Sequence, residues 1–447
     1  MSPLEVLVIG AGKSTYFLLE YLYEYVESVN GEIYLADANS ELLQKKSKGK
    51  NIKTVQLDIT DQQKCFEVVR GKKLVVSMLP ASMHIRVAEI CLQLGVNLIT
   101  ASYISPEIQK MHNLVEEKGL IFLNELGVDP GLDHLSAMQA LDRLRNQGNE
   151  ITAFESFTGG LMAPESENPP WNYKFTWNPR NVVLAGQGGA VKFLHEGRYK
   201  YIPYQKLFRR TEIINIEGFG KFEGYANRDS LKYQQTYKLE KIKTLYRGTL
   251  RKPGFCKAWN LFVQLGLTDD SYKITNSDKL TNRDFINTFL PYHPSDSVEI
   301  KLKQYLSLQQ DDIHLWEKLE YLELFKEERI NLPNASPAEI LESILTKKWT
   351  MKNTDKDMVA MWHKIGYRSS IGDSFEENLS MVVIGENQQK TAMAKTVGLP
   401  LAIGAKLILE NKISQKGVLL PTYPEIYEPI LAELKDFGIV FEEKTIE

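Results

Sequence analysis

The sequence is poor in the residues that build metal sites and disulfide frameworks. Three cysteines (Cys65, Cys91 and Cys256) are scattered along 447 residues without a CxxC pair. The seven histidines are also dispersed, and none shows HExxH-type spacing. Neither a disulfide framework nor a zinc site is therefore expected, and we predict no bound metal.

Charge of one sign and long hydrophobic runs are also lacking. The formal net charge is −3, so no polyanion-binding surface is indicated and we expect no nucleic-acid partner. The longest apolar stretch, near residues 397–405, is short and has Lys395 and Lys406 at its flanks. The N-terminal residues do not resemble a signal peptide. We therefore expect no membrane partner and a cytoplasmic protein.

The first 127 residues alternate apolar runs with amphipathic segments. We expect the apolar runs to be fully buried parallel strands, and they lie at residues 4–9, 33–37, 54–58, 74–79, 97–102 and 120–126. Amphipathic segments such as 16–29 and 83–95 separate them. This order predicts an α/β fold with a doubly wound parallel sheet.

The rest of the chain shows three further patterns of composition and residue spacing, so two or three domains are expected. Residues 151–265 are rich in aromatics, glycines and β-forming runs, which predicts a mixed or antiparallel sheet. Residues 268–348 have helical spacing, and Ser336-Pro-Ala-Glu339 is a good helix start, so we predict a small helical insertion. Runs at 358–365 and 379–384 are expected to rejoin the middle sheet, before a long helix at 391–411 and an αβ tail at 426–441.

A glycine turn and a carboxylate indicate a dinucleotide site. Gly10-Ala-Gly12 follows a strand and opens a helix, which lets a pyrophosphate approach the helix N-terminus; the alternative is a plain strand-to-helix turn. Thr15 stands where a third glycine is usual. Asp37 ends the second strand, where an acid bonds the ribose hydroxyls and repels a 2′-phosphate; otherwise it is a solvated loop carboxylate. The residues favour NAD over NADP.

Two later segments end strands at the same carboxyl edge of the sheet. They are residues 101–106 and the block Asn124-Glu-Leu-Gly-Val-Asp-Pro-Gly-Leu-Asp-His134. Tyr103 and Asp129 are the polar groups best placed to move a proton there. The alternatives are an ordinary half-buried aromatic for Tyr103 and turn or helix-cap chemistry for Asp129. His134 is interpreted as structural.

Two arginines in polar turns of the middle region, Arg228 and Arg251, suit a substrate with several carboxylates. A guanidinium pairs bidentately with a carboxylate. The alternative for each is a solvated surface charge.

Six motifs occur in an order that resembles one enzyme family. They are Ser102-Tyr-Ile-Ser-Pro106, the Asn124–His134 block, Gly159-Gly-Leu161, Tyr173-Lys-Phe-Thr-Trp177, Asn227-Arg-Asp-Ser230 and Arg247-Gly-Thr-Leu-Arg251. Together they resemble saccharopine reductase, the glutamate-forming saccharopine dehydrogenase, and the corresponding half of the bifunctional lysine-degrading enzyme. The resemblance continues to Pro421-Thr-Tyr-Pro-Glu-Ile-Tyr427 and so covers nearly the whole chain.

The resemblance implies three domains and a homodimer. A Rossmann dinucleotide-binding domain would comprise residues 1–128 and 392–447. A mixed α/β substrate-binding and dimerisation domain would comprise residues 129–267 and 357–391. A small all-helical domain, residues 268–356, would be inserted into the second.

The resemblance also implies an activity: oxidation of saccharopine with NAD(P)+ and water to 2-aminoadipate 6-semialdehyde and L-glutamate, in the degradation of lysine. From their place at the sheet edge, and not from the resemblance, we predict Asp129 and Tyr103 as the catalytic residues. The implied substrate contacts are Ser102, Tyr103, Asp129, Arg228, Thr249, Leu250 and Arg251. The implied cofactor contacts are Gly10, Ala11, Gly12, Lys13, Asp37, Asp58, Ile59, Leu79, Ala101, Ser102, Val128, Asp129, Pro130 and Asn178.

Two positions depart from the family pattern. Many fungal members use NADP and lack an acid where this chain has Asp37, so the resemblance also points to NAD. Thr158 stands where a cysteine is common, so no thiol acid or base is proposed there. Two alternatives are a related imine reductase, such as a carboxynorspermidine-type enzyme with an acidic pocket, and a non-catalytic nucleotide-binding scaffold.

Overall fold

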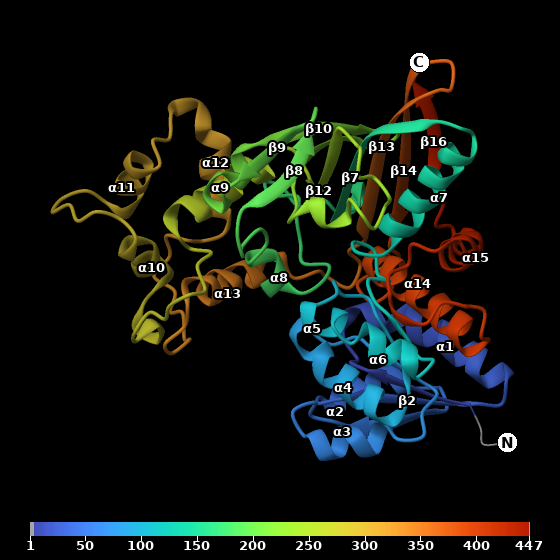
Figure 1. Cartoon of the computed structure of the whole chain (residues 1–447). Helices are drawn as coiled ribbons and strands as arrows, with labels where there is room; N and C mark the ends of the chain where they lie inside the picture. Colours follow the sequence, from blue (N-terminus) through green and yellow to red (C-terminus); the bar gives the residue numbers. More distant parts are fainter. Residues whose placement is uncertain (1–3, 447) are drawn as a thin grey trace. The chain divides into compact units, whose positions relative to one another are not determined.

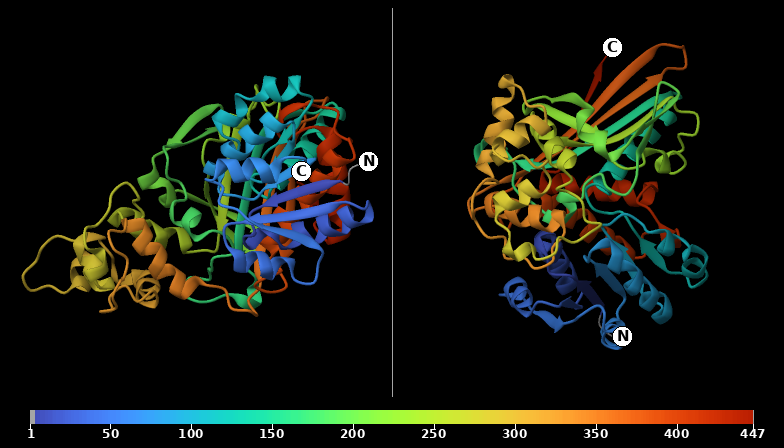
Figure 2. Two further views of the ribbon diagram at one scale, coloured as in Figure 1. Left: turned by 90° about the horizontal axis from the view of Figure 1, so that it is seen from below. Right: turned by 90° about the vertical axis from the view of Figure 1, so that its left-hand side faces the viewer.

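The computed structural model describes residues 4–446 and divides into two compact units. The first unit comprises Met1–Ile151 and Ile365–Glu447, and the second comprises Thr152–Lys364. The three-domain boundaries given above stay a prediction. Figure 1 shows the order of the elements along the chain, and Figure 2 shows them from two further directions.

The first unit is built on a seven-stranded parallel sheet, so the doubly wound prediction is confirmed. Across the sheet the strands are β15 (Gly417–Leu419), β6 (Ile121–Leu123), β5 (Asn97–Thr100), β4 (Leu74–Ser77), β1 (Glu5–Ile9), β2 (Glu32–Asp37) and β3 (Ile52–Gln56). The expectation of full burial was wrong for part of β2, where Tyr34 and Asp37 are half-buried, and for β3. The strand β3 has only one neighbouring strand, and of its five residues only Ile52 is buried.

Helices cover both faces of this sheet. Alternate strand residues such as Leu7, Val75 and Leu98 pack with α3 (Gln62–Val69), α4 (His84–Leu94) and α6 (His112–Glu117). On the other face, α14 (Ala392–Leu409) packs against α1 (Tyr16–Ser28). The helix α14 is long and apolar enough to cross a membrane by length and composition, but 78% of that stretch is buried inside the protein.

Four further helices among residues 4–446 belong to the first unit. They are α2 (Ser40–Ser47), α5 (Pro106–Gln109), α7 (Leu132–Asn146) and α15 (Pro424–Leu434). Of these, α7 begins inside the Asn124–His134 block and packs against α15.

A second sheet is mixed, as predicted. Its strand order is β10 (Thr211–Ile216), β11 (Gly220–Ala226), β12 (Thr244–Arg251), β7 (Glu150–Met162), β13 (Asp357–Arg368), β14 (Ser374–Ile384) and β16 (Glu442–Ile446), with the hairpin of β8 (Val191–His195) and β9 (Arg198–Ile202) beside β12. The β12–β7 pair is parallel, whereas β11–β12 is antiparallel. The late strands β13 and β14 join this sheet, as the pattern at 358–365 and 379–384 predicts.

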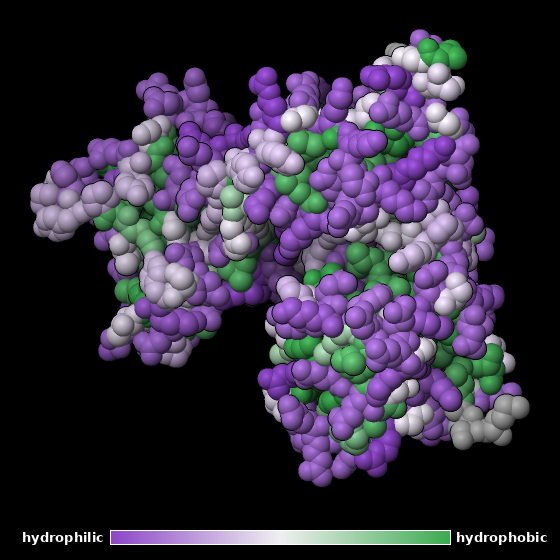
Figure 3. All heavy atoms as spheres, viewed as in Figure 1, coloured by the Kyte–Doolittle hydropathy of each residue, from purple (hydrophilic) through white to green (hydrophobic). Residues whose placement is uncertain are grey.

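Helices follow β12 in the second unit. They are α9 (Phe255–Leu265), α10 (Asn282–Thr288), α11 (Val298–Tyr305), α12 (Ile313–Tyr321) and α13 (Pro337–Trp349). The predicted capping box is present, because Ser336 and Glu339 bond each other's backbone N–H at the start of α13. A separate helical domain for residues 268–356 stays a prediction. Over the face drawn in Figure 3, hydrophobic residues form small groups among hydrophilic ones.

Candidate active site

The turn after β1 can accommodate a dinucleotide. Gly10 has φ +105°, and a Cβ added there would lie 2.9 Å from the carbonyl oxygen of Met78. A Cβ on Gly12 would meet nothing within 4 Å, so space is open where a pyrophosphate would approach. Thr15, in the place of the third glycine, is buried and donates its hydroxyl to the Gly12 carbonyl at 2.8 Å. The threonine therefore fixes the turn by a bond that glycine cannot make.

Asp37 is tied to this turn. It ends β2, and its Oδ2 accepts a hydrogen bond from the backbone N–H of Ala11 at 2.7 Å. Its Oδ1 accepts a second from Asn39 at 2.8 Å. The carboxylate therefore lies beside the glycine turn, where a ribose hydroxyl is bound in this fold.

Other predicted cofactor contacts lie at the carboxyl ends of their strands. Asp58 follows β3 and accepts two hydrogen bonds from Thr60, which lower the pKa of its carboxyl. Ile59 is buried, and Leu79 packs against the core after β4. Lys13 follows Gly12, and Ala101 follows β5. The parallel sheet thus brings these residues to one edge, the edge at which α/β sheets bind ligands.

Tyr103 and Asp129 contact each other. The Tyr103 hydroxyl donates to Asp129 Oδ1 at 2.7 Å, although 26 residues separate them in the chain. Both side chains are partly buried. Val128 and Pro130, the neighbours of Asp129, are buried, and the Asp129–Pro130 peptide is cis. A carboxylate and a phenol in direct contact can pass a proton between them and a bound ligand.

A buried glutamate holds this segment together, and sequence reasoning missed it. Glu125 is 2% exposed and has φ 57°. Its Oε1 accepts the backbone N–H of Ile104 at 2.9 Å, and its Oε2 lies 2.9 Å from His134 Nε2. Its own N–H donates to the Ser102 carbonyl at 3.2 Å. Glu125 and His134 therefore fasten the 102–104 loop to the start of α7, which agrees with a structural His134.

We expect His134→Phe to lower the free energy of unfolding by about 3 kcal/mol, because it leaves one buried partner of a hydrogen-bonded pair without the other. Chemical denaturation of the full chain measures this. In the double variant Glu125→Leu/His134→Phe, the loss should be smaller than the sum of the two single losses, because the contact between the two side chains is removed only once. A cost below about 1 kcal/mol for His134→Phe would show that the pair does not brace the block.

Arg251, at the end of β12, is a buried guanidinium without a carboxylate partner. It is 5% exposed, and no carboxylate of residues 4–446 forms an ion pair with it. The guanidinium carbon lies 5.4 Å from the ring centroids of Tyr173 and Phe255 and 5.8 Å from that of Tyr225. Its Nη1 donates to the Leu250 carbonyl at 2.9 Å, while Nε has no partner in the described structure.

The carboxylate opposite Arg251 is engaged elsewhere. Glu223 faces Arg251 in the β11–β12 register, but its two oxygens accept the backbone N–H groups of Gly254 and Cys256 at 2.7 and 3.0 Å. Glu223 thus caps the start of α9. A buried charge in proteins is normally paired, so Arg251 is suited to a carboxylate supplied by a ligand.

Arg228 lies towards the other end of the same pair of strands. Its neighbour Asn227 donates to the Arg247 carbonyl at 2.9 Å, four residues before Arg251. At ~3.3 Å per residue, the backbone at Arg247, opposite Asn227, lies about 13 Å along the strand from the backbone at Arg251. Arg228 is exposed and has φ 53°. An extended substrate with carboxylates at both ends fits this spacing.

The positions of the other predicted residues of the second unit do not by themselves indicate a ligand contact. Leu250 is fully buried, and Thr249 pairs with Thr158 across β12 and β7. Thr158 Oγ1 is buried and lacks a hydrogen-bond partner among residues 4–446. Asn178 is exposed and caps α8 (Pro179–Val183) through the N–H of Arg180. Its predicted cofactor contact stays a prediction.

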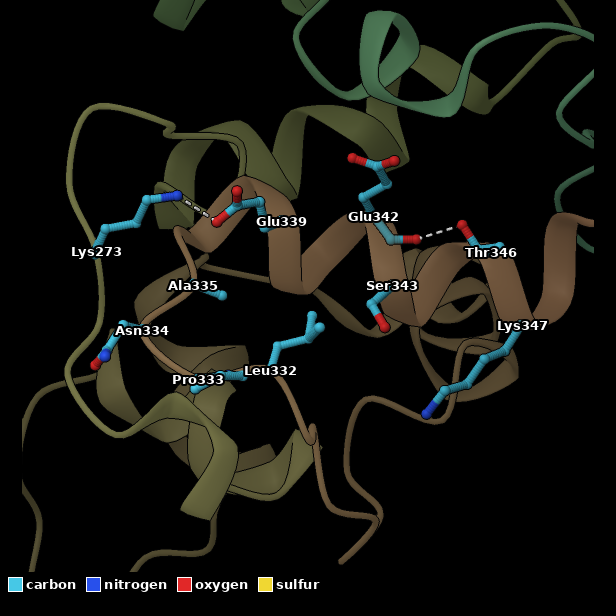
Figure 4. Close-up of a pocket in the computed structure, with 10 residues that line it drawn as sticks. All are labelled: Lys273, Leu332, Pro333, Asn334, Ala335, Glu339, Glu342, Ser343, Thr346 and Lys347. Carbon is cyan, nitrogen blue, oxygen red and sulfur yellow. Dashed lines mark hydrogen bonds and ion pairs between the residues drawn. The ribbon is translucent and has the colours of Figure 1, made fainter. Parts of the chain in front are cut away.

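A hollow of about 630 Å³ lies elsewhere in the second unit, beside α13 (Figure 4). Lys273 and Glu339 pair at 2.5 Å on one side of it, and Lys347 lies at the other end. None of the ten residues that line it is among those predicted to bind dinucleotide or substrate. The candidate dinucleotide residues therefore lie at the sheet edge of the first unit, and Arg251 lies on β12 in the second unit.

Known proteins resemble the chain over nearly its full length. It is 36% identical over 446 residues to the mitochondrial alpha-aminoadipic semialdehyde synthase of Rattus norvegicus, covering 98% of this chain and 47% of that protein. The chain thus spans about half the length of this relative. It is 30% identical to the saccharopine dehydrogenase [NADP(+), L-glutamate-forming] of Saccharomyces cerevisiae, covering 92% of each.

The structure and two family models agree with these relatives. The apo saccharopine dehydrogenase (L-Glu forming) of Saccharomyces cerevisiae superposes with a TM-score of 0.88 at 27% identity, covering 99% of this chain and 100% of that one. Residues 6–123 match the saccharopine dehydrogenase NADP binding domain, and residues 127–439 match the saccharopine dehydrogenase C-terminal domain. The first unit is thus a nicotinamide dinucleotide-binding fold. The chain belongs to the saccharopine dehydrogenase family.

Proposed function

We propose that the chain oxidises saccharopine, with a nicotinamide dinucleotide and water, to 2-aminoadipate 6-semialdehyde and L-glutamate. The reaction belongs to lysine metabolism, and we propose degradation as its physiological direction. The observation that carries the proposal is Arg251, a buried guanidinium with aromatic rings around it and no ion-paired carboxylate in residues 4–446. Such a group fits a substrate with several carboxylates.

The proposed division of labour follows the two units. In the second unit, Arg251 binds one substrate carboxylate, and Arg228 binds another about 13 Å away along the strands. In the first unit, the glycine turn and Asp37 bind the dinucleotide, which when bound accepts a hydride from the carbon next to the secondary amine. Tyr103 orients the amine or the water, and Asp129 accepts protons.

The proton balance explains why a carboxylate and a phenol in contact are useful. Oxidation of the amine gives an iminium, and water adds to its carbon with loss of a proton. Asp129 accepts that proton, and Tyr103, which donates to Asp129 Oδ1, holds the carboxylate in place. The proton then passes to the nitrogen of glutamate as the carbon–nitrogen bond of the carbinolamine breaks, and the hydroxyl proton of the carbinolamine passes to Asp129 and from there to solvent, which leaves the aldehyde. Semialdehyde and glutamate leave.

The experiment that tests this function compares substrates with the purified full chain. We expect nicotinamide absorbance to rise with saccharopine and to stay flat with carboxynorspermidine, because a polyamine substrate favours an acidic pocket and Arg251 makes a basic one. Turnover of the polyamine alone would favour the related imine reductase. Dinucleotide binding without turnover of either would favour a non-catalytic scaffold.

For the cofactor we propose NAD rather than NADP. The family model that matches residues 6–123 is named for NADP, and so is the yeast relative. What supports NAD in this chain is Asp37, whose carboxylate lies beside the glycine turn. A 2′-phosphate would bring negative charge against it.

We expect Asp37→Ser to shift the ratio of kcat/KM values for NAD and NADP by about 100-fold towards NADP, which corresponds to about 2.7 kcal/mol of lost discrimination. Steady-state kinetics with both dinucleotides measures the ratio. Glu41→Gln removes the same charge from the first turn of the neighbouring α2 and should leave the ratio within about 2-fold. A wild-type preference for NADP, or an equal shift in both variants, would exclude the proposed role of Asp37.

A further inference from the structure

A buried histidine lies behind the predicted site residue Ser102. His84 is the first residue of α4 and is 2% exposed. Its Nδ1 lies 2.8 Å from Ser77 Oγ, at the end of β4. Its Nε2 lies 2.8 Å from Ser102 Oγ and 3.1 Å from Thr100 Oγ1, at the end of β5. One imidazole therefore joins hydroxyl groups from two neighbouring strand ends.

The ring makes these contacts as a neutral group. Its three partners are hydroxyls, and burial lowers the pKa of His84 to about 4. A neutral imidazole has one N–H donor and one acceptor nitrogen, and a hydroxyl can serve as either partner. In both tautomers Nε2 is within hydrogen-bond distance of Ser102 Oγ, so the ring fixes this oxygen whichever nitrogen holds the proton.

The backbone of Ser102 is already held by other groups. Its N–H donates to Thr100 Oγ1 at 3.3 Å, and its carbonyl accepts the N–H of Glu125 at 3.2 Å. Only the side chain is left to rotate, and a serine side chain has three staggered positions of similar energy. The contact with His84 selects one of them.

We propose that His84 is a positioning residue, which fixes the Ser102 hydroxyl at the carboxyl edge of the sheet and so prepares it to bind the dinucleotide and the substrate. This inference rests on the proposed function, in which Ser102 contacts both ligands. Ser77 holds the far side of the ring, so the positioning chain runs from Ser77 through His84 to Ser102.

The experiment is a double-mutant cycle in the full-length chain. His84→Phe keeps the ring shape and removes both nitrogens, Ser102→Ala removes the hydroxyl, and the double variant removes both. His84→Gln is the conservative variant, because its amide retains a donor and an acceptor. Cys91→Ala is the matched control, since it truncates another fully buried side chain of α4 that packs in the core. Two readouts are measured: kcat/KM for saccharopine, and the Kd for NADH by fluorescence titration.

We expect His84→Phe and Ser102→Ala each to lower kcat/KM about 10-fold and to raise the Kd for NADH about 3-fold. The double variant should be no worse than either single one, since two residues that act through one contact are not additive. His84→Gln should recover kcat/KM to within about 3-fold of wild type. Cys91→Ala should lower the melting temperature and leave both readouts unchanged. If His84→Phe does not fold, Ser77→Ala replaces it in the cycle. Ser77→Ala should lower kcat/KM about 3-fold in the wild-type background and should have no effect in the Ser102→Ala background.

Losses that multiply in the double variant would overturn the proposal, because His84 would then act independently of Ser102. Equal losses in His84→Phe and Cys91→Ala would also overturn it, by showing only a loosened helix. The NADH titration separates this failure from failure of the proposed function. If wild type does not oxidise saccharopine, the function is wrong, while coupling between His84 and Ser102 is still measured by NADH binding.

Discussion

Replacing Arg251 by methionine is expected to lower kcat/KM for saccharopine about 1,000-fold, through a raised KM, while the protein stays as stable as wild type or becomes more stable. Removing the buried guanidinium partner of a ligand carboxylate typically costs about 4 kcal/mol of binding free energy. The protein itself has no carboxylate paired with Arg251 within residues 4–446. Replacing this buried charge by an apolar side chain of similar volume is therefore neutral or favourable for folding. Steady-state kinetics and thermal unfolding measure the two effects.

Two further variants refine this expectation. Arg251→Lys keeps the charge but not the planar fork, and should retain part of the affinity, with a loss of about 30-fold. Arg247 lies on the same strand, and its guanidinium carbon lies 4.3 Å from the centroid of the Tyr233 ring. Arg247→Met is therefore a matched control. This control should lower stability by lost packing and keep KM within about 3-fold. An unchanged KM in Arg251→Met would show that no substrate carboxylate binds there.

Asp129→Asn is expected to lower kcat about 1,000-fold with little change in KM. The amide oxygen can still accept the hydrogen bond from Tyr103, which is 2.7 Å long in the structure, so the local arrangement is kept. What is lost is the ability to take up a proton, and general acid–base catalysis typically contributes 100- to 10,000-fold, that is, roughly this much. Tyr103→Phe removes the hydroxyl that holds the carboxylate and orients the amine or the water, and a loss of kcat of about 10-fold is expected.

The pH dependence of kcat distinguishes a proton acceptor from a merely structural aspartate. Wild type should lose activity as pH falls and Asp129 becomes protonated, whereas Asp129→Asn should lack this acidic limb. The double variant Tyr103→Phe/Asp129→Asn should be slower than Asp129→Asn, because the Tyr103 hydroxyl also orients the amine or the water, but by less than the roughly 10-fold expected for Tyr103→Phe alone. Unchanged turnover in Asp129→Asn would exclude the catalytic role.

Most strands of the first unit could be predicted from local pattern, because each apolar run matches one strand of a parallel sheet. The prediction of full burial was wrong for β3, which is mostly exposed, and for part of β2, where Tyr34 and Asp37 are half-buried. The β3 run looks like the others, but its edge position depends on the strand order of the whole sheet. The predicted helix start at Ser336 was confirmed for a similar reason, since a capping box needs only four consecutive residues.

Contacts over long distances in the chain were harder to predict. The sequence predicts only that Tyr103 and Asp129 each follow a strand at the same edge of the sheet; it does not predict the hydrogen bond between them. Glu125 lies inside the block that was singled out, but nothing local shows that its carboxylate is buried against His134 and Ile104. The pattern at His84 is weaker still. Its one local signal is its place at the start of the helix after β4, a position that faces the ligand-binding edge.

The buried state of Arg251 could not be read from sequence either. The residues around it argue equally for a solvated turn, and its burial comes from Tyr173, Tyr225 and Phe255, which are far apart in the chain. The same holds for Glu223, whose role as the cap of α9 removes the one carboxylate opposite Arg251. The sequence predicts only a basic pocket, whereas these contacts identify Arg251 as a residue that can anchor a substrate carboxylate.

The most direct test of the account is product stoichiometry with the purified full chain, saccharopine and each dinucleotide in turn. We predict one glutamate and one semialdehyde for every reduced nicotinamide formed, with NAD turned over faster than NADP, and an equal, roughly 1,000-fold fall in the rate of formation of all three in Arg251→Met at saccharopine concentrations below KM. Reduced nicotinamide without glutamate, or no reduction with either dinucleotide, would contradict it.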